Sequence, residues 1–131
     1  MKLFLSIKFY EDSSNTDLIK NIIASAKISG NEMVSIFTDY ENNGEKHFTP
    51  NELMKITFEA INSCDAMVIE FSEKGVGLGI EAGYAYSKNI PIFVIAKTNS
   101  DISDTLKGIS KEIFIYNNLN ELNDFFSRIR I

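Results

Sequence analysis

Three glycines alternate with other residues at positions 75, 77 and 79, and a glutamate, Glu81, follows them. Glycine lets a backbone approach a ligand closely, the start of a helix offers free N–H groups to an anion, and a carboxylate can act as a nucleophile. Gly75, Gly77, Gly79 and Glu81 are therefore candidate binding and catalytic residues. A tight turn followed by an ordinary glutamate at a helix start would use the same residues.

The glycine segment matches neither of the two common phosphate-binding motifs. No Gly-Lys-Ser/Thr sequence follows it, and Ala82 occupies the position of the last glycine of a dinucleotide fingerprint. The pattern predicts that Glu81 lies in the first turn of a helix, where the helix dipole would keep the pKa of its carboxyl low. A low pKa suits a nucleophile or a charge stabiliser and does not suit a general acid.

The numbers of histidines and cysteines and the net charge exclude several classes of ligand and partner. His47 is the only histidine and Cys64 the only cysteine, so we expect no metal, no cofactor and no Ser-His-Asp triad. The single cysteine fits a reducing, cytoplasmic compartment. A net charge of −5 with scattered basic residues disfavours nucleic acid, and no apolar run approaches the roughly 20 residues that span a bilayer. A small molecule is the expected partner.

Short apolar runs alternate with segments of helical periodicity, which is typical of an α/β protein with a parallel sheet. We expect strands at residues 2–9, 33–38, 66–71, 91–96 and 112–116. Helices are expected between a cap at Asn15 or Thr16 and Gly30, and over residues 49–63, 75–89 and 119–129, with a loop or short helix at 101–108. Right-handed crossovers then predict one domain, residues 1–131, with a doubly wound, flavodoxin/Rossmann-like sheet of order 2-1-3-4-5.

In such a sheet, ligands bind beyond the carboxyl ends of the strands, at the switch between the first and third strands. Residues 6–12 and 72–81 should therefore meet on one rim. Tyr10 follows the first strand, where it could stack on a base. Glu70 ends the third strand, where it either serves the site or is a solvated charge. The polar loop at 39–51 contains residues 39–46, which form either a flap over the site or a plain exposed loop.

The run from Asp65 to Ala85, followed by Lys88 and Pro91, resembles the nucleoside 2-deoxyribosyltransferase family, which includes the 2'-deoxynucleoside 5'-phosphate N-hydrolases. Ser6-Ile7-Lys8 is similar to the Ser-Ile-Arg of the hydrolase branch, and residues 103–108 are similar to a segment that reaches a neighbouring subunit's site. The resemblance implies a homodimer or higher homo-oligomer that acts on a nucleoside or nucleotide. It also implies that Glu81 attacks the anomeric carbon as the base departs, and that water or a second base then takes the sugar.

Two positions depart from the family's pattern. Thr57 stands where family members usually carry an aspartate that assists at the ribose and base. Gly75 stands where transferases have Asp and phosphate-accepting hydrolases have Ser. Because a hydroxyl cannot usefully take up a proton near neutral pH, Glu70 is a candidate substitute for the missing aspartate.

Four residues together are candidates for binding a 5'-phosphate, and they slightly favour a nucleoside monophosphate as the substrate: Ser6, Lys8, Ser72 and Ser103. The lysine would act as a point charge, without the fork of an arginine, and each serine is otherwise explained as a turn or cap hydroxyl. Two other functions stay open. One is a nucleotide-binding sensor that has lost its catalysis, and the other is an NAD glycohydrolase of the Toll/interleukin-receptor type.

Overall fold

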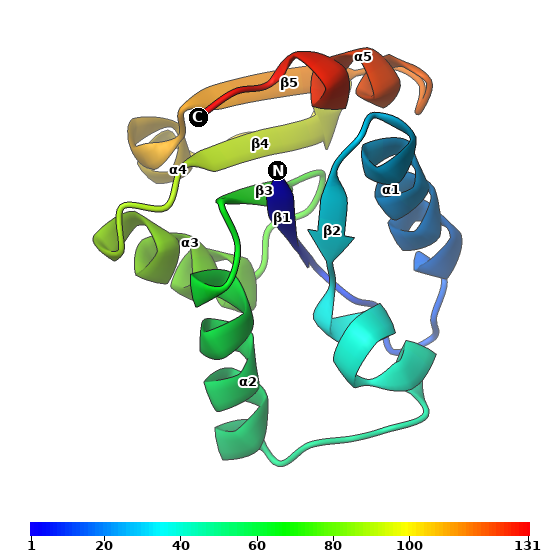
Figure 1. The fold of residues 1–131 in the computed structure, drawn as a ribbon, viewed down its shortest axis with the longest axis vertical. Coiled ribbons are helices and arrows are strands. Elements are labelled where there is room, and N and C mark those ends of the chain that lie inside the picture. The colour runs from blue at the N-terminus through cyan, green and yellow to red at the C-terminus, as the bar shows by residue number, and fades with distance from the viewer.

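The predicted parallel sheet is present, and its strands have the predicted order. A computed structural model describes all 131 residues. The strands are β1 (Lys2–Ile7), β2 (Glu32–Val34), β3 (Ala66–Glu70), β4 (Ile92–Lys97) and β5 (Glu112–Tyr116). All neighbouring strands run parallel, in the order β2-β1-β3-β4-β5 (Figure 1). The expected fold class is thereby confirmed.

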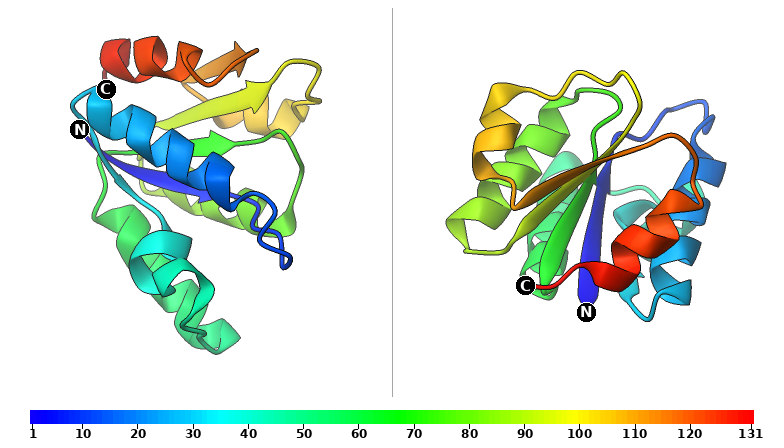
Figure 2. Two further views of the ribbon diagram at one scale, coloured as in Figure 1. Left: turned by 90° about the vertical axis from the view of Figure 1, so that its right-hand side faces the viewer. Right: turned by 90° about the horizontal axis from the view of Figure 1, so that it is seen from above.

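Helices cover both faces of the sheet, as Figure 2 shows from two directions. They are α1 (Thr16–Ile28), α2 (Pro50–Asn62), α3 (Val76–Ser87), α4 (Asp104–Ile109) and α5 (Glu121–Arg128). One core cluster joins α1 and α5 to one face, and a second joins α2, α3 and α4 to the other. Successive residues of β1 divide between them: Leu3 and Leu5 enter the first cluster and Phe4 enters the second. No helix has the length and apolar character needed to cross a membrane.

The first two strands end earlier than their apolar runs predict. β1 ends at Ile7 instead of Phe9, and β2 ends at Val34 instead of Thr38. After β2 the backbone N–H of Ser35 donates to the Asp39 carboxylate at 2.9 Å, so it is lost to the sheet. The chain instead forms two short helical turns, η1 (Ile36–Tyr40) and η2 (Asn42–Gly44), within what looked like strand and loop.

Local sequence signals set several helix ends. Thr49 caps α2 through a complete capping box: its hydroxyl accepts from the Glu52 N–H at 3.3 Å, and its own N–H donates to the Glu52 carboxylate at 3.1 Å. Gly30 ends the α1 region with φ +86°, which only glycine adopts without strain. The expected cap of α1 differs, because the Asn15 side chain bonds to the loop after β1 and not to the helix.

The capping box should stabilise α2, which forms one wall of the candidate site described below. Thr49→Ala removes the hydroxyl acceptor and leaves an N–H of the first turn without its partner, so the free energy of unfolding should fall by about 1 kcal/mol. Urea denaturation would measure this change. Ser14→Ala is the matched control, since Ser14 is exposed and its hydroxyl makes no hydrogen bond. Equal stability of the two variants would contradict the role of the box.

Candidate active site

Glu81 lies deeper in its helix than its sequence context predicts. Because α3 begins at Val76, Glu81 is in the second turn and not in the first. The Ser6 hydroxyl at the end of β1 donates to the Glu81 carboxylate at 3.3 Å. Gly77 lies one turn earlier on the same helix face, and a Cβ added there would be 3.6 Å from the other carboxylate oxygen. The carboxylate is thus placed between β1 and α3.

This placement reverses the expected direction of the pKa shift. Burial raises the pKa of Glu81 from 4.5 to about 7, and the hydrogen bond from Ser6 only partly opposes the rise. The expectation of a low pKa was wrong, because the carboxyl is past the free N–H groups of the helix start and has lost much of its contact with water. At neutral pH, Glu81 is therefore poised between its acid and base forms.

Glu81 faces a cavity of about 210 Å³ between β1, η1, α2 and α3. Most of its wall is apolar, and it is lined by Phe4, Leu5, Ile7, Phe9, Ile19, Ser35, Ile36, Phe37, Glu41, Leu53, Met54, Thr57, Gly77 and Glu81. The Phe9 and Phe37 rings stack with their centroids 4.3 Å apart. The cavity is smaller than the roughly 300–1,000 Å³ of typical ligand pockets, so it fits one ring or sugar and not a whole nucleotide.

Thr57, where the resemblance leads one to expect an aspartate, lines the same cavity as Glu81. The threonine is buried, and its hydroxyl donates to the Leu53 carbonyl at 2.7 Å. That bond uses the only hydrogen that the hydroxyl has to give. Thr57 therefore supplies a wall of the cavity and no proton.

A second, smaller pocket of about 60 Å³ lies at the carboxyl ends of β1 and β3. It brings together five of the predicted residues: Ile7, Lys8, Tyr10, Glu70 and Ser72. Ile7 also lines the Glu81 cavity, so the two spaces adjoin. The predicted meeting of the β1 and β3 rims is therefore confirmed.

Charges of both signs surround the small pocket. Lys8 forms an exposed ion pair with Glu73 at 3.6 Å, and Lys97 also lines the space. Hydrogen bonding to Glu73, with some burial, raises the pKa of Tyr10 to about 12, so its hydroxyl stays protonated. An anion entering here would meet two ammonium groups, but it would have to displace Glu73 from Lys8.

Glu70 is not a solvated charge at the strand end. It is buried, and both of its oxygens are occupied: the Ser72 N–H and hydroxyl donate to them at 2.7 and 2.8 Å, and the Tyr116 hydroxyl donates as well. The Ser72 oxygen in turn accepts from the Lys97 N–H at 2.9 Å. Burial and the Glu70 carboxylate raise the pKa of Tyr116. Glu70 therefore holds the loop that leads from β3 to α3.

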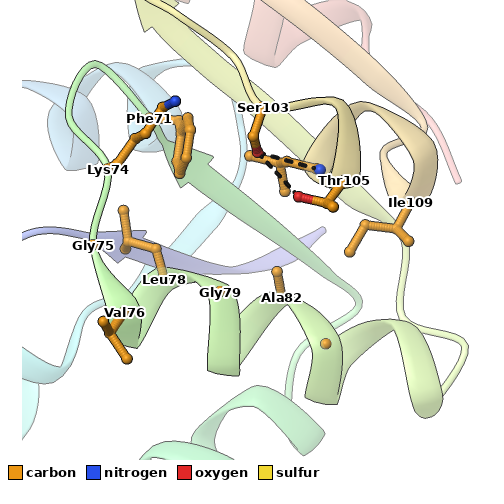
Figure 3. A pocket seen from close by; sticks show the side chains of 12 residues that line it. Phe71, Lys74, Gly75, Val76, Leu78, Gly79, Ala82, Ser103, Thr105 and Ile109 are labelled. Atoms are coloured by element: carbon orange, nitrogen blue, oxygen red, sulfur yellow. Dashed lines mark hydrogen bonds between the residues drawn. The ribbon is translucent and has the colours of Figure 1, made fainter.

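The remaining predicted residues lie on the other side of α3, along a groove of about 550 Å³ between α3 and α4. Ser103 caps α4, and its oxygen accepts from the Leu106 N–H at 3.4 Å. Gly75 and Gly79 also line the groove, and Figure 3 shows Ser103 across from the α3 side chains. Within one chain, the predicted phosphate set is thus divided among three places: Ser6 is buried against Glu81, Lys8 and Ser72 line the small pocket, and Ser103 lies at the groove.

Sequence reasoning missed four residues that the structure adds to these spaces. Phe9 and Phe37 lie where strands had been expected, and Glu41 lies in the polar loop. The fourth, Asn15, is buried. Its side-chain oxygen accepts a hydrogen bond from the Tyr10 N–H and its side-chain nitrogen donates to the Lys8 carbonyl, so it fixes the loop after β1. Only the last had a sequence signal, since asparagine before a helix commonly bonds to nearby backbone.

No protein-family model and no curated protein sequence matches the chain. Solved structures do match in fold. The CMP N-glycosidase BcmB of Clostridium botulinum has a TM-score of 0.70 at 19% identity, covering 95% of this chain and 97% of that one. The 2-deoxyribosyltransferase of Bacillus psychrosaccharolyticus has a TM-score of 0.73 at 13% identity, covering 95% and 91%.

The same architecture also serves proteins of another kind. A response regulator receiver domain protein of Clostridium thermocellum matches with a TM-score of 0.56 at 13% identity, over 95% of this chain and 96% of that one. The N-glycosidase and the deoxyribosyltransferase have higher TM-scores to this chain than the receiver domain has. The comparisons therefore confirm the fold and agree with the resemblance seen in the sequence, while the chemistry has to be argued from the site.

The partly buried Glu81 carboxyl should make the stability of the protein depend on pH, which can be measured without a substrate. Its pKa is about 7 when folded and near 4.5 when unfolded, so the unfolded chain gives up the proton more easily. Folding is therefore penalised as pH rises from 4.5 through 7, by up to about 3 kcal/mol. Glu81→Gln should raise the free energy of unfolding by up to that amount at pH 8 and leave it nearly unchanged at pH 4, as measured by urea denaturation. A gain that is equal at both pH values would contradict the shifted pKa.

Proposed function

We propose that this chain cleaves the N-glycosidic bond of a nucleoside 5'-monophosphate or nucleoside, with Glu81 as the nucleophile. The observation that carries the proposal is the position of the Glu81 carboxylate, which is hydrogen-bonded by Ser6 and faces a mostly apolar cavity. The likeness of the fold to an N-glycosidase and a deoxyribosyltransferase supports it, as does the sequence from Asp65 to Ala85.

In the first step, an oxygen of the ionised form of Glu81, which a pKa of about 7 leaves well populated at and above neutral pH, bonds to the anomeric carbon while the bond from that carbon to the base nitrogen breaks. The electron pair leaves with the base, and the sugar passes through an oxocarbenium-like state. A carboxylate in a poorly hydrated cavity stabilises this positive charge more strongly than one in water. The hydroxyl of Ser6 keeps one carboxylate oxygen oriented. Water, or a second base, then attacks the glycosyl ester and frees Glu81.

The phosphate of a monophosphate substrate would enter the small pocket that adjoins the cavity. Lys8 and Lys97 bring positive charge there, and Ser72 brings a hydroxyl. Glu73 would exchange its ion pair with Lys8 for solvent, which costs little because exposed pairs contribute only about 0–1 kcal/mol. This arrangement supports a 5'-phosphate more than a bare nucleoside.

Base release is the direct test. Purified protein incubated with ribo- and deoxyribonucleosides, their monophosphates and NAD should release free base from at least one monophosphate, as chromatography would detect. Glu81→Ala should reduce the rate by about 10³-fold or more, and azide should restore it by forming a glycosyl azide. Glu59→Ala, which alters an exposed glutamate on α2, is the control and should keep full activity.

Three outcomes of this test contradict the proposal. Base release that persists in Glu81→Ala would exclude Glu81 as the nucleophile, and release from NAD alone would point to an NAD glycohydrolase. Monophosphate binding without any base release would indicate a sensor module. The Thr57 hydroxyl, committed to the Leu53 carbonyl, is the observation that favours this second function.

We also propose that the active form is a homodimer in which a second copy covers the groove between α3 and α4. Val76 is 83% exposed and Ile80 is 50% exposed on α3, and Gly79 and Gly83 next to them allow close approach of another chain. Such a contact would bring Ser103 of one copy near the glycine segment of the other. The resemblance to a segment that reaches a neighbouring subunit supports this arrangement.

Light scattering after size-exclusion chromatography tests the dimer. The unaltered chain should have twice the mass of one chain, and Val76→Asp, at an exposed residue that lines the groove, should be monomeric, because a charge cannot be buried unpaired in an apolar contact. The control is Ile28→Asp, which places the same charge at a residue of α1 that is 77% exposed and lies away from the groove. A monomer for the unaltered chain at all concentrations would exclude a role for Ser103 across an interface.

A further inference from the structure

A second carboxyl, that of Glu41, lines the Glu81 cavity. These two residues are the only titratable groups in the cavity wall, and they come from different elements: Glu81 from α3, and Glu41 from the junction of η1 and η2. Figure 1 shows these two turns, drawn in cyan below β2, on the side of the sheet where β1 ends. A pair of carboxyls facing one small space is the arrangement that glycosidic-bond cleavage uses, one as nucleophile and the other as proton donor.

The backbone of Glu41 is held firmly while its carboxyl is left free. Its N–H donates to the Ile36 carbonyl at 2.9 Å, and its own carbonyl accepts from the N–H groups of Gly44 and Lys46 at 3.0 and 2.9 Å. Its side chain makes no hydrogen bond and no ion pair in the structure. The carboxyl is half-buried, and burial raises its pKa, which the nearby His47 partly opposes. The backbone that carries Glu41 is therefore fixed, and its carboxyl has no hydrogen-bond or ion-pair partner within the protein.

The other candidates for a proton donor are already committed. The Thr57 hydroxyl gives its hydrogen to the Leu53 carbonyl, and both oxygens of Glu70 accept hydrogen bonds within the loop after β3. Glu70 also lines the small pocket and not the cavity. Of the groups considered for this role, only Glu41 combines a free carboxyl with a place in the cavity.

We propose that Glu41 is the acid that protonates the departing base, a role that rests on the proposed glycosidic-bond cleavage. As the bond from the anomeric carbon to the base nitrogen breaks, that nitrogen takes the carboxyl proton of Glu41, and Glu81 forms the ester with the sugar. Glu41, now a carboxylate, then takes a proton from the water that attacks the ester. Glu81 leaves as a carboxylate, and both residues return to their starting states.

The wall next to Glu41 suits a base. Phe9 and Phe37 line the same cavity as a stacked pair, and Phe9 is 38% exposed, so part of its surface is free to contact a further ring. A flat base lying on Phe9 would fill most of the cavity that Glu41 lines, and the sugar would lie at the opening of the cavity toward the adjoining small pocket. The nucleophile and the acid would then act on opposite ends of the same bond.

Changing the leaving group separates an acid from a structural residue. Glu41→Gln keeps the size of the side chain but has no proton to transfer, so base release from the best nucleotide substrate should fall by about 10²–10⁴-fold. The 4-nitrophenyl glycoside of the same sugar phosphate is a substrate whose leaving group, 4-nitrophenolate, departs as an anion without protonation. Glu41→Gln should cleave this substrate as fast as the unaltered protein does. Glu45→Gln is the control, since Glu45 is an exposed neighbour outside the cavity wall, and it should retain both activities.

Each other outcome has a distinct meaning. Equal losses on both substrates would overturn the acid role and assign Glu41 to binding or structure. Undiminished base release by Glu41→Gln would overturn the role while leaving Glu81 and the proposed function intact. If the unaltered protein releases no base from any substrate, the proposed function falls, and the role of Glu41 falls with it.

Discussion

The arrangement of the site depends on one carboxylate that is kept partly away from water. Glu81 can face an apolar cavity only because the Ser6 hydroxyl, buried at the end of β1, supplies one hydrogen bond, and because Gly77 leaves room beside the second oxygen. Burial lifts the pKa of the group to about 7, so the folded state carries the free-energy cost of a poorly hydrated charge. The two apolar clusters that cover the faces of the sheet stabilise the fold enough to offset this cost at the carboxyl end of β1.

Two buried polar side chains hold the loops around that carboxylate. Asn15 bonds to both ends of the turn after β1, and Glu70 ties Ser72 to Tyr116 across the sheet. Neither residue faces the Glu81 cavity. Each instead fixes the backbone from which the neighbouring residues project, so the shape of the site follows from polar groups that are satisfied within the protein. This explains why a carboxylate expected at the site is found supporting it.

The fold could be predicted because its signals are local. Apolar runs, the Thr49 cap and Gly30 each specify an element without reference to distant residues, and the handedness of crossovers then sets the strand order. The site could be predicted only in part. Three of its features depend on three-dimensional packing. They are the turn of α3 that carries Glu81, the placement of Ser103 and Lys8 in different pockets, and the short turn that carries Glu41. Polar loop residues carry no periodicity from which such placements could be read.

The turn that carries Glu41 is built from its own short-range hydrogen bonds, and its tip contains Asn42, Asn43 and Gly44, all with positive φ. It adds no strand to the sheet, whereas Glu81 projects from a helix packed into the core. The two carboxyls are therefore held in different ways, one by local hydrogen bonds and the other by packing against the sheet. The tip of this turn, residues 42–44, could therefore change in length or sequence while Glu41, Phe37 and Glu81 keep their places, which would alter the surroundings of the base without removing either carboxyl.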